Sequence, residues 1–196
     1  TDIGRLWVKS VSSSDQATDL FPEGADNRRM AEETSIGLRD QQAYMDRESG
    51  RLRATNLVDK WDAVAELMEG IPKGRLLECG PGTGLYSVRF LRMGYEVHAV
   101  DISRKSLDIA EEFIDSHGLS ARYNTYHGGF SETATALGKG FEVAVFIKVL
   151  HHFPTRESIE EAMRTAYDML APGGYIVGFE PNGASPYWPI GYRMLD

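Results

Sequence analysis

The chain has 196 residues, a net charge of −8 at pH 7 and one cysteine, Cys79. This length allows one domain with a substantial core and a small appendage, but not two full domains. The acidic balance argues against a nucleic-acid partner, which would require a basic face, and against docking on anionic membranes. Neither a transmembrane run nor a signal-peptide pattern is present, and a lone cysteine suits a reducing compartment. We therefore expect a cytoplasmic protein.

The sequence divides into four predicted segments. Residues 1–29 are largely polar and aperiodic, which predicts a flexible N-terminal segment. Residues 30–70 carry apolar side chains near 3.6-residue spacing, which predicts a helical lid. Residues 71–182 form the predicted core, and residues 183–196 begin a substrate-side segment that we expect to be truncated.

Short apolar runs alternate with amphipathic stretches in the predicted core. We predict strands over residues 75–79, 96–101, 121–126, 142–149 and 175–179. We predict helices over residues 84–93, 105–116, 131–137 and 155–170, with a turn at Pro172-Gly173-Gly174. Strands that alternate with helices indicate an α/β fold, a doubly wound Rossmann-like parallel sheet with right-handed crossovers.

A glycine-rich loop follows the first predicted strand. Gly80, Gly82 and Gly84 stand at every second position, and glycine can adopt the positive φ values that a tight turn under a ligand requires. A dinucleotide-binding loop would place glycine where Leu85 stands, and no Lys-Ser or Lys-Thr pair follows as in a phosphate loop. Asp101 ends the second predicted strand, where an acidic side chain can bind a ribose.

The pattern Glu-x-Gly-x-Gly-x-Gly, with Asp101 17 residues after Gly84, resembles motif I of the class I S-adenosylmethionine-dependent methyltransferases. The resemblance implies S-adenosyl-L-methionine as cofactor and S-adenosyl-L-homocysteine as product. It implies no metal. Cofactor contacts are implied for Tyr44, Glu78, Gly80, Pro81, Gly82, Gly84, Asp101, Ile102, Gly129, Phe130 and Lys148.

Several of these contacts have specific roles in the family. Ile102 corresponds to the position that packs on the adenine ring, and Tyr44 to an aromatic residue that closes over the cofactor. Gly129 stands where many members carry an aspartate that bonds the adenine amino group, so this contact is expected from the backbone of Gly129 and Phe130. The backbone at Lys148 is expected near the amino end of the cofactor.

Two histidines follow the fourth predicted strand, in a Val-Leu-His-His sequence that resembles the corresponding family motif. His152 and His151 are therefore candidate general bases, because histidine exchanges protons near neutral pH. The alternative is that they only orient a loop. Glu180-Pro181-Asn182, after the fifth strand, resembles a group of bacterial small-molecule methyltransferases.

We therefore expect a methyltransferase that acts on an O, N or C atom of a small-molecule metabolite, with a homo-oligomer left open. One alternative is a catalytically silent subunit that binds the cofactor. A less favoured one is an NAD(P)-dependent oxidoreductase, against which Leu85 argues.

The family's sheet normally continues beyond the fifth strand with an antiparallel pair. Only residues 183–196 remain here, too few for a helix and both strands. We expect that the chain is a fragment or that a partner supplies the edge, because an unpaired edge strand promotes aggregation.

Overall fold

A computed structural model describes residues 4–10, by their backbone, and residues 61–181. The strands are β1 (Gly4–Ser10), β2 (Arg75–Cys79), β3 (Glu96–Asp101), β4 (Tyr123–His127), β5 (Phe141–Ile147) and β6 (Leu170–Pro181). The helices are α3 (Trp61–Leu67), α4 (Ser87–Arg92), α5 (Arg104–Asp115), α6 (Phe130–Ala136) and α7 (Arg156–Met169), with short 3₁₀ turns η2 (Ser120–Arg122) and η3 (Leu150–His152).

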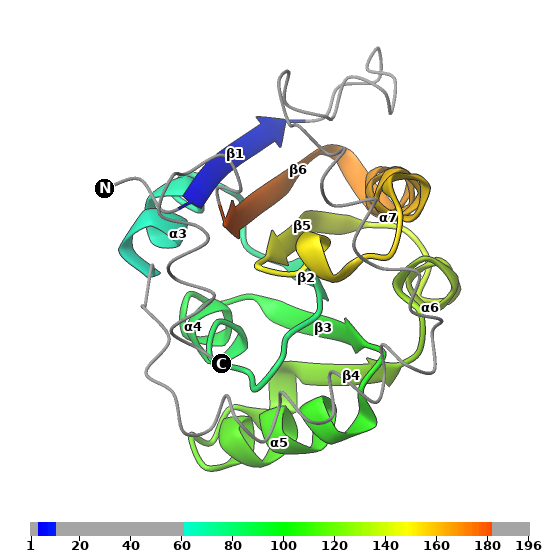
Figure 1. Cartoon of the computed structure of the whole chain (residues 1–196). Helices are drawn as coiled ribbons and strands as arrows, with labels where there is room; N and C mark the ends of the chain where they lie inside the picture. Colours follow the sequence, from blue (N-terminus) through cyan, green and yellow to red (C-terminus); the bar gives the residue numbers. More distant parts are fainter. Residues whose placement is uncertain (1–3, 11–60, 182–196) are drawn as a thin grey trace.

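The strands form a single sheet in the order β1-β6-β5-β2-β3-β4 (Figure 1). Strands β2 to β6 are all parallel, which confirms the predicted doubly wound sheet. The chain runs outward from β2 through β3 to β4, and then returns to place β5 on the other side of β2. The carboxyl ends of β2 and β5 therefore flank the point where the strand order reverses, which is where open α/β sheets bind ligands.

Strand β1 covers the edge of the sheet that was expected to lack a partner. It pairs antiparallel with β6, in a register that runs from Gly4 opposite Pro181 to Ser10 opposite Tyr175. The prediction of a flexible segment over residues 1–29 is therefore wrong for residues 4–10. The expectation that another polypeptide supplies this edge is also wrong, because β1 of the same chain forms the main-chain hydrogen bonds along the outer edge of β6.

The predicted turn at Pro172-Gly173-Gly174 lies inside β6. Opposite the two-residue step from Phe141 to Val143, β6 advances from Leu170 to Tyr175. This irregularity accommodates the extra residues as a bulge, and Gly173 adopts φ +78° within it. The turn chemistry was predicted, but its place within a continuous strand was not.

Two apolar cores lie on opposite faces of the sheet. Helices α6 and α7 pack on one face, where Leu77, Phe146 and Met163 are buried, and α3, α4 and α5 cover the other face (Figure 1). Strand β5 contributes to both cores, as expected for a strand that is apolar throughout. Burial of each large apolar side chain contributes about 1.5–3 kcal/mol, so the sheet is a firm support for the loops at its edge.

Candidate functional site at the carboxyl edge of the sheet

The three glycines of the loop after β2 all adopt the left-handed conformation. Their φ angles are +65° at Gly80, +55° at Gly82 and +81° at Gly84. Residues with a Cβ atom are strained in this conformation, which explains why the sequence repeats glycine here. The predicted tight turn is therefore present, and the backbone N–H of Gly80 ties it to Val100 of β3 at 2.8 Å.

The three positions differ in what surrounds them. A Cβ on Gly80 would lie 2.4 Å from Cγ2 of Val149, in the loop after β5, and a Cβ on Gly84 would lie 3.2 Å from Cβ of Ala110 in α5. No atom lies within 4 Å of a Cβ built on Gly82. Gly80 and Gly84 are thus required for packing, while Gly82 leaves space at the tip of the loop.

Glu78, the last but one residue of β2, is buried beneath the loop. The hydroxyl of Ser87, in the first turn of α4, donates a hydrogen bond of 2.6 Å to its Oε2. Burial raises the pKa of Glu78 to about 7; the Ser87 bond opposes this shift and the charge of Asp101 adds to it. The Glu78 side chain thus connects β2 to α4 across the base of the glycine loop. In this position it can hold the loop backbone in place.

Asp101 ends β3, and its carboxylate is held at the same edge of the sheet. Oδ1 accepts the backbone N–H of Ser103 at 2.8 Å, and the backbone oxygen of Asp101 accepts the N–H of Gly128 at 3.0 Å. Ser103 in turn caps α5, because its Oγ accepts the N–H of Ser106. The half-buried Ile102 lies between them. The strand end and the start of α5 thus fix where the carboxylate sits.

Gly129 and Phe130 lie at the start of α6, past the end of β4. No atom lies within 4 Å of a Cβ built on Gly129. The Phe130 ring is buried edge-on against Phe146, with ring centroids 5.3 Å apart. Its side chain therefore belongs to the core, and any contact with a ligand would come from the backbone, as the sequence suggested.

The chain turns sharply at Lys148, directly after β5. Lys148 adopts φ +55°, the one non-glycine residue with a positive φ among those described. Its backbone N–H bonds to the carbonyl oxygen of Phe179 in β6 at 2.7 Å. A left-handed conformation costs roughly 1–2 kcal/mol for a residue with a side chain, and such strain is often found at functional sites. It also ends β5 two residues earlier than predicted.

Glu180, near the end of β6, binds the loop that follows Lys148. Its Oε1 accepts the backbone N–H groups of Val149 and Leu150, and its Oε2 contacts Nδ1 of His151 at 2.8 Å. We did not predict Glu180 as a site residue. The available signal was its place after an apolar strand, at the same edge as the histidines.

The two candidate histidines have different surroundings although their rings lie 4.0 Å apart. Burial lowers the pKa of His152 to about 3, and the neighbouring His151 adds to this shift. His152 is therefore neutral and weakly basic near pH 7. His151 is the one that meets the Glu180 carboxylate.

The predicted site residues that the structure describes all lie at or next to this edge of the sheet. Gly80, Pro81, Gly82 and Gly84 follow β2, Asp101 and Ile102 follow β3, and Lys148, His151 and His152 follow β5. Tyr44 lies outside the described residues. No group of three or more His, Cys, Asp or Glu side chains that could hold a metal occurs among the described residues. Within the same residues, no helix is long and apolar enough to cross a membrane.

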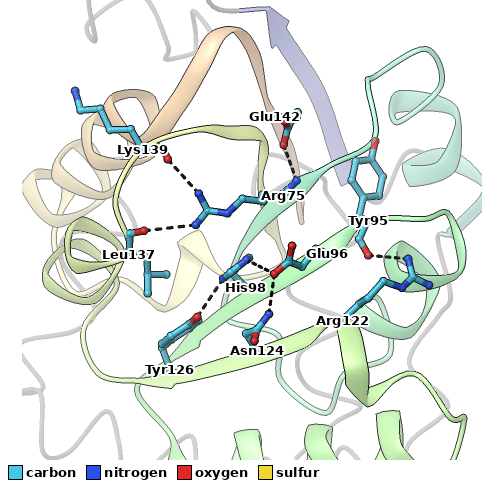
Figure 2. Close-up of polar contacts among 10 residues, drawn as sticks. All are labelled: Arg75, Tyr95, Glu96, His98, Arg122, Asn124, Tyr126, Leu137, Lys139 and Glu142. Carbon is cyan, nitrogen blue, oxygen red and sulfur yellow. Dashed lines mark hydrogen bonds and ion pairs between the residues drawn. The ribbon is translucent and has the colours of Figure 1, made fainter.

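A second histidine, His98, makes polar contacts along β3 and with the neighbouring strand β4, away from these loops. Nδ1 of His98, on β3, is 3.1 Å from the hydroxyl of Tyr126, and Nε2 is 3.2 Å from Oε1 of Glu96 (Figure 2). Burial lowers the pKa of His98, Arg75 lowers it further and Glu96 opposes the shift. His98 therefore packs within the sheet and takes no part in the edge described above.

Known proteins resemble the chain in both sequence and fold. A ubiquinone biosynthesis O-methyltransferase of Caulobacter sp. is 35% identical over 104 residues, which cover 53% of this chain and 39% of that relative. A tRNA 5-carboxymethoxyuridine methyltransferase of Escherichia coli is 27% identical over 127 residues, 65% of this chain and 47% of the relative. The chain thus spans less than half the length of these relatives.

The solved structures share the architecture at lower sequence identity. The structure of a DhpI–SAM–HEP complex superposes with a TM-score of 0.60 at 22% identity, over 83% of this chain and 73% of that one. A family model described as a methyltransferase domain matches residues 44–193, and the chain belongs to this family.

Proposed function

We propose that this chain binds S-adenosyl-L-methionine at the carboxyl edge of β2 and β3 and transfers its methyl group to a small-molecule acceptor. The observation that carries the proposal is the left-handed glycine loop after β2, with the buried carboxylate of Asp101 beside it at the end of β3. The loop lies at the point where the strand order reverses, and the carboxylate ends the neighbouring strand at the same edge of the sheet.

Each residue has an assigned role in this proposal. The backbone around Gly82 receives the methionine half, because space is left at that position. Asp101 accepts the ribose hydroxyls, and Ile102 packs on the adenine. The backbone of Gly129 and Phe130 bonds the adenine, and Lys148 presents its backbone toward the amino end. Glu78 supports the loop from below, and Tyr44 stays a proposed cover.

Bound cofactor would supply a sulfonium methyl group that is already electrophilic. The protein's contribution is then to align the acceptor with this methyl group and to exclude water. A small-molecule acceptor is supported by the net charge of −8, since a nucleic-acid substrate is normally bound by a basic surface. One relative is named as a tRNA methyltransferase, so transfer RNA belongs in any substrate test.

Thermal unfolding with a panel of cofactors tests the cofactor assignment. We expect S-adenosylmethionine and S-adenosylhomocysteine to raise the melting temperature, because ligands that bind only the folded state stabilise it, while NAD and NADP leave it unchanged. Stabilisation by a nicotinamide cofactor alone would refute the assignment.

A second experiment separates an active enzyme from a silent cofactor-binding subunit. Purified protein is incubated with methyl-labelled S-adenosylmethionine and either a mixture of small hydroxyl and amino compounds or transfer RNA. We expect labelled product from the small-molecule mixture. Label in the RNA would overturn the acceptor class, and binding without any product would support the silent subunit.

A further inference from the structure

The carboxylate of Glu180 is bonded through both of its oxygens. Oε1 accepts the N–H groups of Val149 and Leu150, each at 2.8 Å, and Oε2 lies 2.8 Å from Nδ1 of His151. The Glu180 side chain is only 12% exposed. The loop after β5 is therefore tied to the end of β6 at three points.

These contacts determine which nitrogen of His151 carries a proton. A carboxylate can only accept hydrogen bonds, so Nδ1 must be the donor. A neutral imidazole has a single N–H group, so Nε2 then has a lone pair that can accept a proton. We propose that Glu180 is a positioning residue that holds His151 in this tautomer, with Nε2 of His151 as the general base of the reaction. The inference rests on the proposed function.

The proposal selects one of two neighbouring histidines. The His151 side chain is 17% exposed and so can meet a substrate. His152 is also partly buried, and burial lowers its pKa to about 3, which makes it a poor proton acceptor near pH 7. Both histidines were candidates on sequence grounds, and two findings separate them: His151 contacts Glu180, and the pKa of His152 is low.

The fold also brings His151 close to the proposed cofactor loop. Val149, two residues before it, packs so closely on Gly80 that a Cβ there would come within 2.4 Å of the valine methyl. Strands β2 and β5 are neighbours in the sheet, so the loops at their carboxyl ends adjoin. A base on the β5 loop therefore stands beside the glycine loop at the reversal point.

The role of His151 implies a class of acceptor. Nε2 takes the proton from the O–H group or the ammonium group of the acceptor, which frees an electron pair on that oxygen or nitrogen. The acceptor's electron pair forms the new bond to the methyl carbon, while the carbon–sulfur bond breaks and its electrons stay on sulfur. The proton ends on His151, whose positive charge faces Glu180. An acceptor with no proton on its attacking atom would need no such base.

The tautomer of His151 can be measured without knowing the acceptor. Long-range ¹H–¹⁵N correlation spectra of histidine-labelled protein separate the Nδ1–H, Nε2–H and doubly protonated forms. At mildly alkaline pH we expect His151 in the native chain to be the Nδ1–H form. In Glu180→Gln, the amide oxygen should stay with the two backbone N–H groups, so the amide NH₂ faces Nδ1, and the proton should move to Nε2.

Glu96→Gln is the matched control, because it alters the other carboxylate that contacts a histidine. This control should leave the His151 signal unchanged. An Nε2–H or a doubly protonated His151 in the native chain would overturn the proposal, and so would an unchanged tautomer in Glu180→Gln. If Glu180→Gln fails to fold, the tautomer of the native chain alone decides.

Calorimetry with S-adenosylhomocysteine distinguishes this proposal from the proposed function. Binding of S-adenosylhomocysteine with the wrong tautomer refutes only the role of His151, whereas absence of binding refutes the cofactor site. With an accepted substrate, His151→Gln should lower kcat by about 100-fold or more with KM little changed. An unchanged kcat would overturn the assignment of the base.

Discussion

Among the described residues, two histidine–glutamate contacts involve strands of the sheet, and they differ in how the glutamate is held. At the carboxyl edge, Glu180 is largely buried and is bonded to two backbone N–H groups as well as to His151. At the amino end of β3, Glu96 is 48% exposed and contacts His98 and the amide of Asn124 (Figure 2). The first glutamate can fix a ring in one state, while the second lies where water screens its charge.

The partners on the other side of each ring differ as well. His98 stacks on Tyr126 at 5.9 Å and meets Phe141 edge-on at 5.3 Å, so its ring is a packing element. His151 neighbours His152 and is partly exposed at the ligand edge. A histidine beside a carboxylate is thus a candidate base only where the carboxylate is fixed and the far nitrogen can meet a ligand.

The largest difference is expected on removing the two glutamates. Glu180→Ala should lower the free energy of unfolding by about 2–4 kcal/mol, because it leaves two backbone N–H groups and a histidine without their acceptor. Glu96→Ala should cost less than about 1 kcal/mol, since the side chain is half exposed. Urea denaturation of both variants measures this, and equal losses would remove the distinction between the two contacts.

Cofactor affinity should depend on the carboxyl edge alone. Asp101→Ala should weaken S-adenosylhomocysteine binding by roughly 1–3 kcal/mol, because hydrogen bonds to a charged group are lost. Asp108→Ala, which removes an exposed carboxylate of α5 paired with Arg104, is the control and should bind normally. Calorimetry gives both values; unchanged affinity in Asp101→Ala would argue against its ribose role.

Glu78 at the carboxyl edge and His98 in β3 should make the free energy of unfolding depend on pH with opposite sign. The pKa of Glu78 is raised to about 7 in the folded chain, so the folded state binds more protons than the unfolded one between about pH 4.5 and 7, and stability falls as pH rises through this window. Glu78→Gln keeps an acceptor for Ser87 and should gain on the order of 1–3 kcal/mol relative to the native chain by pH 7.5.

His98 gives the opposite trend. Its pKa is lowered in the folded chain, mainly by burial, so the unfolded state binds more protons below about pH 6.5 and stability falls as pH drops below that value. In His98→Gln, the free energy of unfolding should decrease less as the pH drops below about 6.5. Urea melts from pH 5 to 8 test both variants, and slopes of the same sign would contradict the assignment.

A small effect is expected for Arg75, whose guanidinium donates to the carbonyl oxygens of Leu137 and Lys139 (Figure 2). The same group lies over the Phe141 ring. Arg75→Lys keeps the charge but loses the forked geometry, so we expect a loss of about 0.5–1.5 kcal/mol in unfolding free energy. S-adenosylhomocysteine affinity should not change. A clear fall in S-adenosylhomocysteine affinity would show that the contacts of Arg75 influence the proposed cofactor site at the carboxyl edge.

Much of the fold follows from local patterns. Strands β2 and β3 begin and end at the predicted residues, because short apolar runs bounded by glycine or polar residues specify a buried parallel strand. The glycine loop and Asp101 were also found in this way. The end of β5 was placed two residues too late, because Val149 continues the apolar pattern although Lys148 already turns the chain.

By itself, the sequence determined the order of strands and helices from β2 to β6, the positive φ of the three loop glycines and the edge on which the acidic and histidine side chains lie. Tertiary structure decided that β1 closes the free edge of β6, more than 160 residues away, and that Glu180 contacts His151 across 29 positions. Periodicity and turn chemistry act over a few residues and can be read along the chain. Pairings between distant segments depend on strand order and register, which only the folded sheet specifies.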